Sequence, residues 1–234
     1  MTKEEFIENC KLLNIKITEE IYNKLCTYHK LLVEWNNKFN LTTILEEKDV
    51  FLLHFYDSLC LSKSTDLNKN IELCDFGTGA GFPGVVIAII FSNTNVTLVE
   101  SNNKKCIFLE EVKKQLNLKN ITVINKRIEE YAKETREKYD VVTCRAVTSI
   151  PIIIEIATSL IKVGGYLLPL KANCEEEVKK YKYLEKDFSL KLENIIKYNL
   201  PINNANREIP VYKKTEKTNE KYPRNYGSII KKYK

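Results

Sequence analysis

The chain has 234 residues, 44% hydrophobic and 29% charged, so it is too apolar to remain disordered and long enough for one α/β domain with a smaller appendage. Its longest uninterrupted apolar run, residues 85–91, is far shorter than the roughly 20 residues that a membrane span needs. We therefore expect no membrane partner.

Seven cysteines are spread along the chain without a C-x-x-C pair, and the two histidines, His29 and His54, lie far from any such pair. This pattern favours buried thiols in a reducing compartment over a disulfide framework or a zinc site. The first five residues include three charged ones, and no apolar export signal follows them. We expect a cytoplasmic protein without a bound metal.

Positive charge is concentrated at the C-terminus. The whole chain has 37 Lys and Arg against 31 Asp and Glu, a net charge of +6 (37 − 31). Residues 212–234 alone hold eight Lys or Arg and two Glu, also +6, so residues 1–211 sum to zero. Such a segment is either a solvated tail or a contact with a polyanion, because Lys and Arg near phosphates release counterions.

Helical periodicity dominates the first quarter of the chain, where apolar residues from Phe6 to Trp35 recur at spacings of three and four. Thr18 is a candidate N-cap, and a second helical run covers residues 46–61 after a polar loop. Residues 62–70 are polar and lack periodicity, which places a domain boundary there. We divide the chain into a helical subdomain (1–65), a Rossmann-like domain (66–215) and a basic tail (216–234).

Strand and helix patterns alternate through the rest of the chain. This order predicts an α/β fold of the Rossmann-like methyltransferase type: a doubly wound, mostly parallel, seven-stranded sheet with an N-terminal helical extension. The expected strands cover residues 71–76, 96–100, 121–124, 139–144 and 166–170, the last after a Gly164-Gly165 turn, with two further strands at 191–199 and 208–214. The expected helices cover residues 83–91, 104–116, 151–161 and 174–186.

A glycine-rich loop, Asp75 through Gly84, lies between the first expected strand and helix. Gly77, Gly79 and Gly81 permit positive φ and a close approach of the backbone to a ligand, although a tight turn without a ligand would use them too. Dinucleotide folds place pyrophosphate at such a loop. The carboxylate of Asp75 instead suits a cofactor with a cationic end and no phosphate, such as S-adenosylmethionine.

Three later residues fall where such a cofactor site needs them. Glu100 ends the second strand, where a carboxylate can accept both ribose hydroxyls, although NAD enzymes place an acid similarly. None of the 13 tyrosines begins the Tyr-x-x-x-Lys motif of short-chain dehydrogenases. Ile128 follows the third strand and could form an apolar wall for adenine. Arg145 ends the fourth strand at the ligand-binding edge, or is a salt-bridged structural arginine.

Missing motifs narrow the methyl acceptor. The chain has no Pro-Pro-aromatic motif of the kind that handles exocyclic amines, and no Pro-Cys pair of the kind that attacks pyrimidine carbon-5. A ring nitrogen with a free lone pair, such as guanine N7, needs neither device. The pattern agrees with N7 without singling it out.

Taken together, collinear motifs across residues 31–232 resemble the RsmG (GidB) family of bacterial 16S rRNA guanine-N7 methyltransferases. The resemblance implies S-adenosylmethionine as cofactor and 16S ribosomal RNA or the small ribosomal subunit as partner, and we expect a monomer. The matching motifs are Asn40-Leu41-Thr42-Thr43, His54 with Asp57-Ser58, Asp75 through Gly84, Glu100-Ser101 with Lys104-Lys105, Arg127-Ile128-Glu129-Glu130, Arg145-Ala146, Leu170-Lys171 and Arg224-Asn225-Tyr226-Gly227.

Methyl transfer from a sulfonium depends on in-line positioning, so we expect no general base. The resemblance also implies roles for individual residues. His54 and Asp57 could alternatively form only helix-capping or interhelical hydrogen bonds. The expected catalytic residues are His54, Arg145 and Lys171. The expected RNA contacts are Lys104, Arg145, Lys171 and Arg224. The expected cofactor contacts are Asp75, Gly77, Gly79, Gly81, Phe82, Glu100, Ser101, Asn102, Ile128, Glu129 and Arg145.

Three other functions stay open at this point. The chain could methylate a protein or a small metabolite, although its basic C-terminus argues for a polyanion. It could be a noncatalytic RNA-binding or ribosome-assembly factor on a Rossmann shell, although the intact glycine loop argues against degeneration. A nicotinamide-dependent oxidoreductase is the third alternative.

Overall fold

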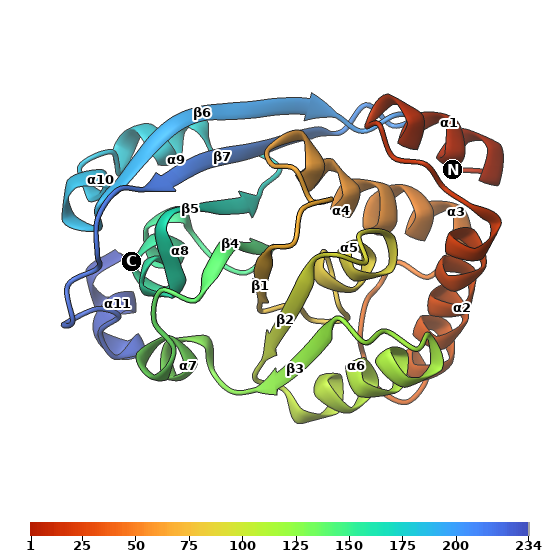
Figure 1. Cartoon of the computed structure of the whole chain (residues 1–234), viewed down its shortest axis with the longest axis horizontal. Helices are drawn as coiled ribbons and strands as arrows, with labels where there is room; N and C mark the ends of the chain where they lie inside the picture. Colours follow the sequence, from red (N-terminus) through yellow and green to blue (C-terminus); the bar gives the residue numbers. More distant parts are fainter. Residues whose placement is uncertain (234) are drawn as a thin grey trace.

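The computed structural model describes residues 1–233, and its centre is a seven-stranded sheet in the order β3-β2-β1-β4-β5-β7-β6 (Figure 1). β1 to β5 run parallel, whereas β7 pairs antiparallel with both β5 and β6. This confirms the expected Rossmann-like, mostly parallel sheet. The strands are β1 (Glu72–Phe76), β2 (Asn95–Glu100), β3 (Ile121–Asn125), β4 (Tyr139–Arg145), β5 (Ile161–Leu170), β6 (Leu190–Asn199) and β7 (Asn206–Lys214).

Helices cover both faces of the sheet (Figure 1). None of those described within residues 1–233 has the length and apolar character to cross a membrane. The α-helices are α1 (Lys3–Leu12), α2 (Glu19–Asn36), α3 (Glu47–Asp49), α4 (Asp57–Leu59), α5 (Gly84–Ile90), α6 (Asn103–Gln115), α7 (Ile128–Glu134), α8 (Ile150–Ala157), α9 (Glu175–Lys180), α10 (Leu184–Asp187) and α11 (Tyr226–Tyr233). The other helical segments are the π-helix η1 (Val50–Tyr56) and the 3₁₀-helices η2 (Cys60–Lys63) and η3 (Thr158–Leu160).

Side chains of the central strands alternate between two apolar clusters, as the period of a strand requires. In β1 and β2, Leu73 and Leu98 join one cluster, and Cys74 and Val99 join the other. α2, η1, α5 and α6 complete the first cluster, and α7, α8 and α11 complete the second. The near-continuous apolar runs of these strands therefore follow from burial on both faces.

The N-terminal helices share the first cluster with the sheet and support the glycine loop. Thr18 accepts a hydrogen bond from the Ile21 amide at 3.2 Å, as expected of the N-cap of α2. Tyr28, fully buried on α2, donates its hydroxyl to the Ala80 carbonyl oxygen in the loop. Its ring also packs on Phe82, with centroids 5.5 Å apart. The helical extension thus fixes the loop from behind.

The expected secondary structure differs from the structure at four places. β5 begins at Ile161, so the glycine pair lies inside the strand as an irregularity between the pairs Tyr139–Ile161 and Val141–Tyr166. The preceding helix ends correspondingly early. The helix expected at 174–186 is split into α9 and α10, because the backbone of Tyr181 is not helical and its ring packs on Tyr233. α7 was not expected, because its seven residues are too short for periodicity and lack a capping side chain.

The segment expected as a basic tail is attached to the sheet domain over most of its length. α11 packs on α8 and buries Ile229 completely. The Arg224 guanidinium donates to both carboxylate oxygens of buried Glu155, at 2.7 and 2.6 Å. Lys234, the last residue of the expected tail, lies outside the described residues.

Not all of the C-terminal charge is free to meet an anionic partner. Lys214 is 1% exposed and donates to the carbonyl oxygens of Thr158 and Ile161, at 2.9 Å each. Burial lowers the pKa of this lysine to about 8. With Arg224 in its ion pair, two of the eight basic residues counted at this end serve internal contacts. The electrostatic case for the C-terminus as an RNA contact is correspondingly weaker.

Candidate active site

The glycine loop connects β1 to α5 and combines tight packing with one open backbone position. Gly77, Gly79 and Gly81 all have positive φ, at 60°, 61° and 103°. A Cβ at Gly81 would lie 2.5 Å from Val85 Cγ2, whereas at Gly79 nothing but the Lys105 amine comes as near as 4.0 Å. Gly81 is therefore required by packing, and the backbone at Gly79 is left accessible to a ligand.

Replacing Gly81 by alanine is expected to destabilise the fold by about 2–5 kcal/mol, because it adds a steric overlap to a left-handed conformation. The measurement is the free energy of unfolding in urea. Gly164→Ala is the matched control: Gly164 also has positive φ, at 87°, but no atom of the described part of the chain lies within 4 Å of an added Cβ. It should cost only about 1 kcal/mol. Equal losses in the two variants would contradict the packing argument.

Asp75, the last-but-one residue of β1, holds the two ends of the loop together. Its Oδ2 accepts hydrogen bonds from the Thr78 hydroxyl at 2.6 Å and the Gly84 amide at 2.8 Å. Its Oδ1 is buried and has no hydrogen-bond partner among the described residues 1–233. Complete burial raises the pKa of this carboxyl to about 7, against the opposing effect of its hydrogen bonds. An unpartnered buried carboxylate oxygen fits a ligand with a cationic group.

Glu100 ends β2 beside the same loop. Its carboxylate accepts from the Gly79 amide at 3.0 Å and from the Asn102 amide at 2.8 Å. Asn102 in turn caps α6 by accepting from the amides of Lys104 and Lys105. A fixed acid at the end of the second strand is the arrangement expected for ribose recognition.

A pocket of about 160 Å³ lies next to the loop, at the carboxyl ends of β1, β2 and β3. It brings together Gly77, Ser101, Ile128 and Glu129, which were all expected to contact the cofactor. Tyr226 from α11 also lines it, although the sequence predicted no cofactor contact for that residue. Its signal in the sequence was the motif Arg224-Asn225-Tyr226-Gly227, of which only Arg224 was assigned a role, as an RNA contact.

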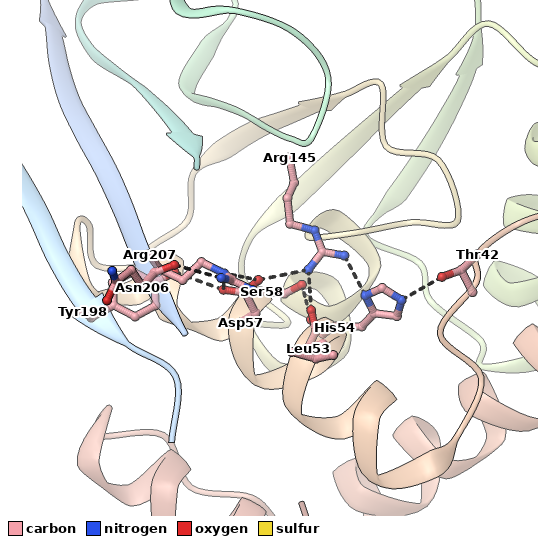
Figure 2. Close-up of polar contacts among 9 residues, drawn as sticks. All are labelled: Thr42, Leu53, His54, Asp57, Ser58, Arg145, Tyr198, Asn206 and Arg207. Atoms are coloured by element: carbon pink, nitrogen blue, oxygen red, sulfur yellow. Dashed lines mark hydrogen bonds and ion pairs between the residues drawn. The ribbon is translucent and has the colours of Figure 1, made fainter. Parts of the chain in front are cut away.

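A second cluster joins the N-terminal helices to the end of β4 (Figure 2). The Arg145 guanidinium points between η1 and α4: it donates to the Leu53 carbonyl oxygen and to His54 Nδ1, both at 3.0 Å. It also lies 3.6 Å from Asp57 Oδ2 and covers the face of Phe82, 5.1 Å from the ring centroid. Arg145 therefore makes the salt bridge expected of a structural arginine and also lies at the ligand-binding edge of the sheet.

The contacts of His54 fix its tautomer. Because a guanidinium can only donate, Nδ1 of His54 accepts from Arg145, and the proton lies on Nε2, which donates to the Thr42 hydroxyl at 3.0 Å. Burial, with a further contribution from Arg145, lowers the pKa of His54 to about 3. The ring also stacks on Phe82, with centroids 4.3 Å apart. A neutral imidazole with both nitrogens engaged orients Arg145 and is not free to act as a base.

Asp57 is shared by two arginines, one of which sequence reasoning missed. Arg207 Nε lies 3.1 Å from each carboxylate oxygen of Asp57, and the Tyr198 hydroxyl donates to Oδ1 at 3.2 Å (Figure 2). Arg207 is the second residue of β7, about 150 residues away in the sequence, with no motif around it. The signal available was only a charged residue just before the apolar run of the strand.

Beside this cluster lies a cavity of about 600 Å³ that is lined by three basic side chains, Arg145, Lys171 and Arg207. Lys171 Nζ donates to the Thr148 carbonyl oxygen at 2.8 Å and lies 3.8 Å from Glu177. His54 and Asp57 line the same cavity. The three residues expected to be catalytic are thus brought together.

Two of the residues expected to contact RNA lie elsewhere. Lys104 lines a separate pocket of about 350 Å³ with Lys105 and residues 36–40, and its amine covers the Phe39 ring at 5.4 Å. Arg224 is engaged with Glu155. Neither lines the cavity of Arg145.

Comparisons with known proteins agree with this geometry. The family model described as rRNA small subunit methyltransferase G matches residues 21–210. Proteins named ribosomal RNA small subunit methyltransferase G are similar to the chain: that of Mesoplasma florum is 44% identical over 92% of this chain and 90% of its own length. That of Bacillus subtilis is 39% identical over 97% of both chains.

Solved structures share the fold at much lower identity. A S-adenosylmethionine-dependent methyltransferase from Aquifex aeolicus superposes with a TM-score of 0.52 at 15% identity, covering 71% of this chain and 93% of that one. TYW2 from M. jannaschii, solved in complex with AdoMet, has a TM-score of 0.52 at 18% identity, covering 62% and 68%. The identities with the relatives above, over nearly the whole chain, show that this chain belongs to the rRNA small subunit methyltransferase G (GidB) family.

Proposed function

We propose that this chain transfers the methyl group of S-adenosylmethionine to N7 of a guanine in 16S ribosomal RNA. Family membership supports a methyltransferase of small-subunit rRNA. The observation that carries the proposal is an unpartnered carboxylate oxygen in the glycine loop, on Asp75, together with a cavity of about 600 Å³ lined by three cationic side chains. Because the proposed partner is ribosomal RNA, we place the protein in the cytoplasm. We also propose that it acts as a monomer.

On the cofactor side, the residues present fit S-adenosylmethionine, which when bound supplies an electrophilic methyl group on a sulfonium. Asp75 and the open backbone at Gly79 would hold the amino group of the amino-acid end. Glu100 would accept the ribose hydroxyls, and Ile128 would contact the adenine. The carboxylates of Asp75 and Glu100 beside the loop would repel a pyrophosphate.

On the substrate side, the cations of the cavity position the guanine and its phosphate. Arg145 and Lys171 each present donors that suit the guanine O6/N7 edge or a phosphate oxygen. N7 attacks with its own lone pair, so no proton has to leave first. The neutral, fully engaged His54 agrees with chemistry that needs no base. Arg145 and Lys171 then accelerate the transfer by holding the guanine in position.

The target guanine must be accessible for this reaction. The major groove of A-form RNA is deep and narrow, so N7 of a paired guanine cannot reach a side chain lining a cavity. We therefore expect a guanine in a loop, or one displaced from its helix, whose N7 comes within about 3–3.5 Å of the methyl carbon.

The test supplies labelled S-adenosylmethionine to the purified protein with small ribosomal subunits, and separately with naked 16S rRNA, both lacking this methylation. Methylated positions are mapped by borohydride and aniline cleavage, which cuts RNA at N7-methylguanosine. We expect label at a single guanine, and labelling about 100- to 1000-fold slower with Arg145→Ala protein. Label on another atom or base would contradict the proposed acceptor. Failure of both substrates to accept label, while the cofactor binds, would contradict rRNA as the substrate.

His54→Ala is expected to lower the methylation rate about tenfold without changing the shape of its pH profile. His54 orients Arg145 and, with a pKa of about 3, stays neutral across the neutral pH range. The measurement is the single-turnover rate between about pH 6 and pH 8. His29→Ala is the control, since His29 contacts the Leu45 carbonyl oxygen away from the cavity. A protonation step that disappears in the His54 variant would show that His54 is a base.

A further inference from the structure

The small pocket beside Ile128 is bordered by a residue from the far end of the chain. Tyr226, the first residue of α11, lines this pocket together with Phe76 at the end of β1 and Val147 after β4. Its side chain stays 40% exposed, so it borders the pocket and does not fill it. These three residues come from separate parts of the chain that only the fold brings together.

The segment that carries Tyr226 is held in place on both sides of it. Immediately before it, Arg224 pairs with fully buried Glu155, and Lys133 Nζ donates to the Asn225 side-chain oxygen at 2.6 Å. Immediately after it, Ile229 is buried against α8. Burying the carboxylate of Glu155 without Arg224 would destabilise the fold, so this ion pair holds the segment in one place. Terminal segments that are not tied down usually fray.

Arg136 provides a further attachment upstream of Tyr226. Its guanidinium donates to the carbonyl oxygens of Thr218 and Tyr222, at 2.8 Å each. The Tyr222 ring packs on Phe188, with centroids 4.5 Å apart. Tyr226 therefore occupies a fixed place at the pocket, set by contacts on both sides in the sequence.

We propose that Tyr226 is a positioning residue of the cofactor site, which covers the adenine of S-adenosylmethionine and strengthens its binding. The inference rests on the cofactor use in the proposed function. The pocket is small, at about 160 Å³, and its lining includes the apolar side chains of Val99, Ile128 and Ile156, which suit a planar purine. An aromatic side chain at its border adds a stacking surface for such a ring. The amino-acid end of the cofactor belongs at Asp75 instead.

The experiment measures the dissociation constants of S-adenosylmethionine and of 5′-methylthioadenosine by calorimetric titration of the full chain. The second probe keeps the adenosine and lacks the amino acid. Tyr226→Ala should weaken both by a similar factor of about 5 to 30, and Tyr226→Phe should bind within about twofold of the wild type. Tyr183→Ala is the matched control, a tyrosine 54% exposed that does not line the pocket.

Equal affinity of Tyr226→Ala and the wild type would overturn the inference and leave the proposed function untouched. A wild-type protein that binds neither probe would overturn both. A loss for S-adenosylmethionine alone would place Tyr226 at the amino-acid end and also overturn the inference. If Tyr226→Ala does not fold, Tyr226→Trp replaces it: the emission of the new tryptophan should change with 5′-methylthioadenosine, beyond any change from Trp35 in the wild type. No added change would count against the inference.

Discussion

Arg145→Ala is expected to lower the rate of rRNA methylation by about 100- to 1000-fold, the usual loss when one positioned charged donor is removed from an active site. The guanidinium is held by the Leu53 carbonyl oxygen, His54 and Asp57, so its place in the cavity is fixed before substrate arrives. The fold should survive, because Asp57 keeps its contacts with Arg207 and Tyr198.

Single-turnover methylation of small subunits measures this loss, and calorimetry measures cofactor affinity separately. Arg145→Lys should restore little, because an ammonium cannot reproduce the planar set of donors to three partners. Lys119→Ala, an exposed residue just before β3, is the control for removing a positive charge. Wild-type methylation by the Arg145→Ala protein would show that Arg145 is only structural, which its contacts alone would also allow.

The glycine loop and the sheet could be read from local sequence, because each depends on residues adjacent in the chain. Strands of the central sheet are apolar runs bounded by turns, and the loop from Asp75 to Gly84 sits between the first strand and its helix. The irregular start of β5 at Ile161 could not be read, since glycines usually mark a turn and here lie within a strand. Pairing with Tyr139 across the sheet determines that outcome.

The parts of the candidate site that escaped prediction depend on contacts between distant segments. Arg207 reaches Asp57 across about 150 residues, and Tyr226 reaches the pocket of Ile128 across about 100. No periodicity or spacing encodes such pairs. A count of charges at the C-terminus has the same limit, because it does not distinguish a solvated lysine from Lys214, whose amine donates to backbone carbonyl oxygens inside the fold.

Asp75→Asn is expected to weaken S-adenosylmethionine binding by about 10- to 100-fold at alkaline pH and to remove a pH dependence near neutrality. Burial sets the pKa of Asp75 near 7 in the free protein. A cationic ligand favours the ionised carboxylate, so its affinity in the wild type should rise with pH through 7 and level off above it. Asparagine keeps the shape and an acceptor for Thr78 and Gly84, but carries no charge.

The same pKa predicts an opposite trend in stability without ligand. The folded carboxyl has a pKa of about 7 and the unfolded one about 4, so between these values the folded state binds more protons. The stability of the wild type relative to Asp75→Asn should therefore decrease as the pH rises from about 4 to about 7. Urea unfolding across this range, with exposed Asp66→Asn as the control, measures the difference.

Calorimetric titrations between about pH 5.5 and pH 8.5 test the binding half of this prediction, by comparing the two proteins at each pH. The amino group of the ligand also titrates in this range, but it does so equally for both proteins and cancels in their ratio. That ratio should grow with pH and then become constant. A constant ratio throughout would mean that Asp75 does not titrate in this range in the free or in the ligand-bound protein, and would contradict a pKa near 7.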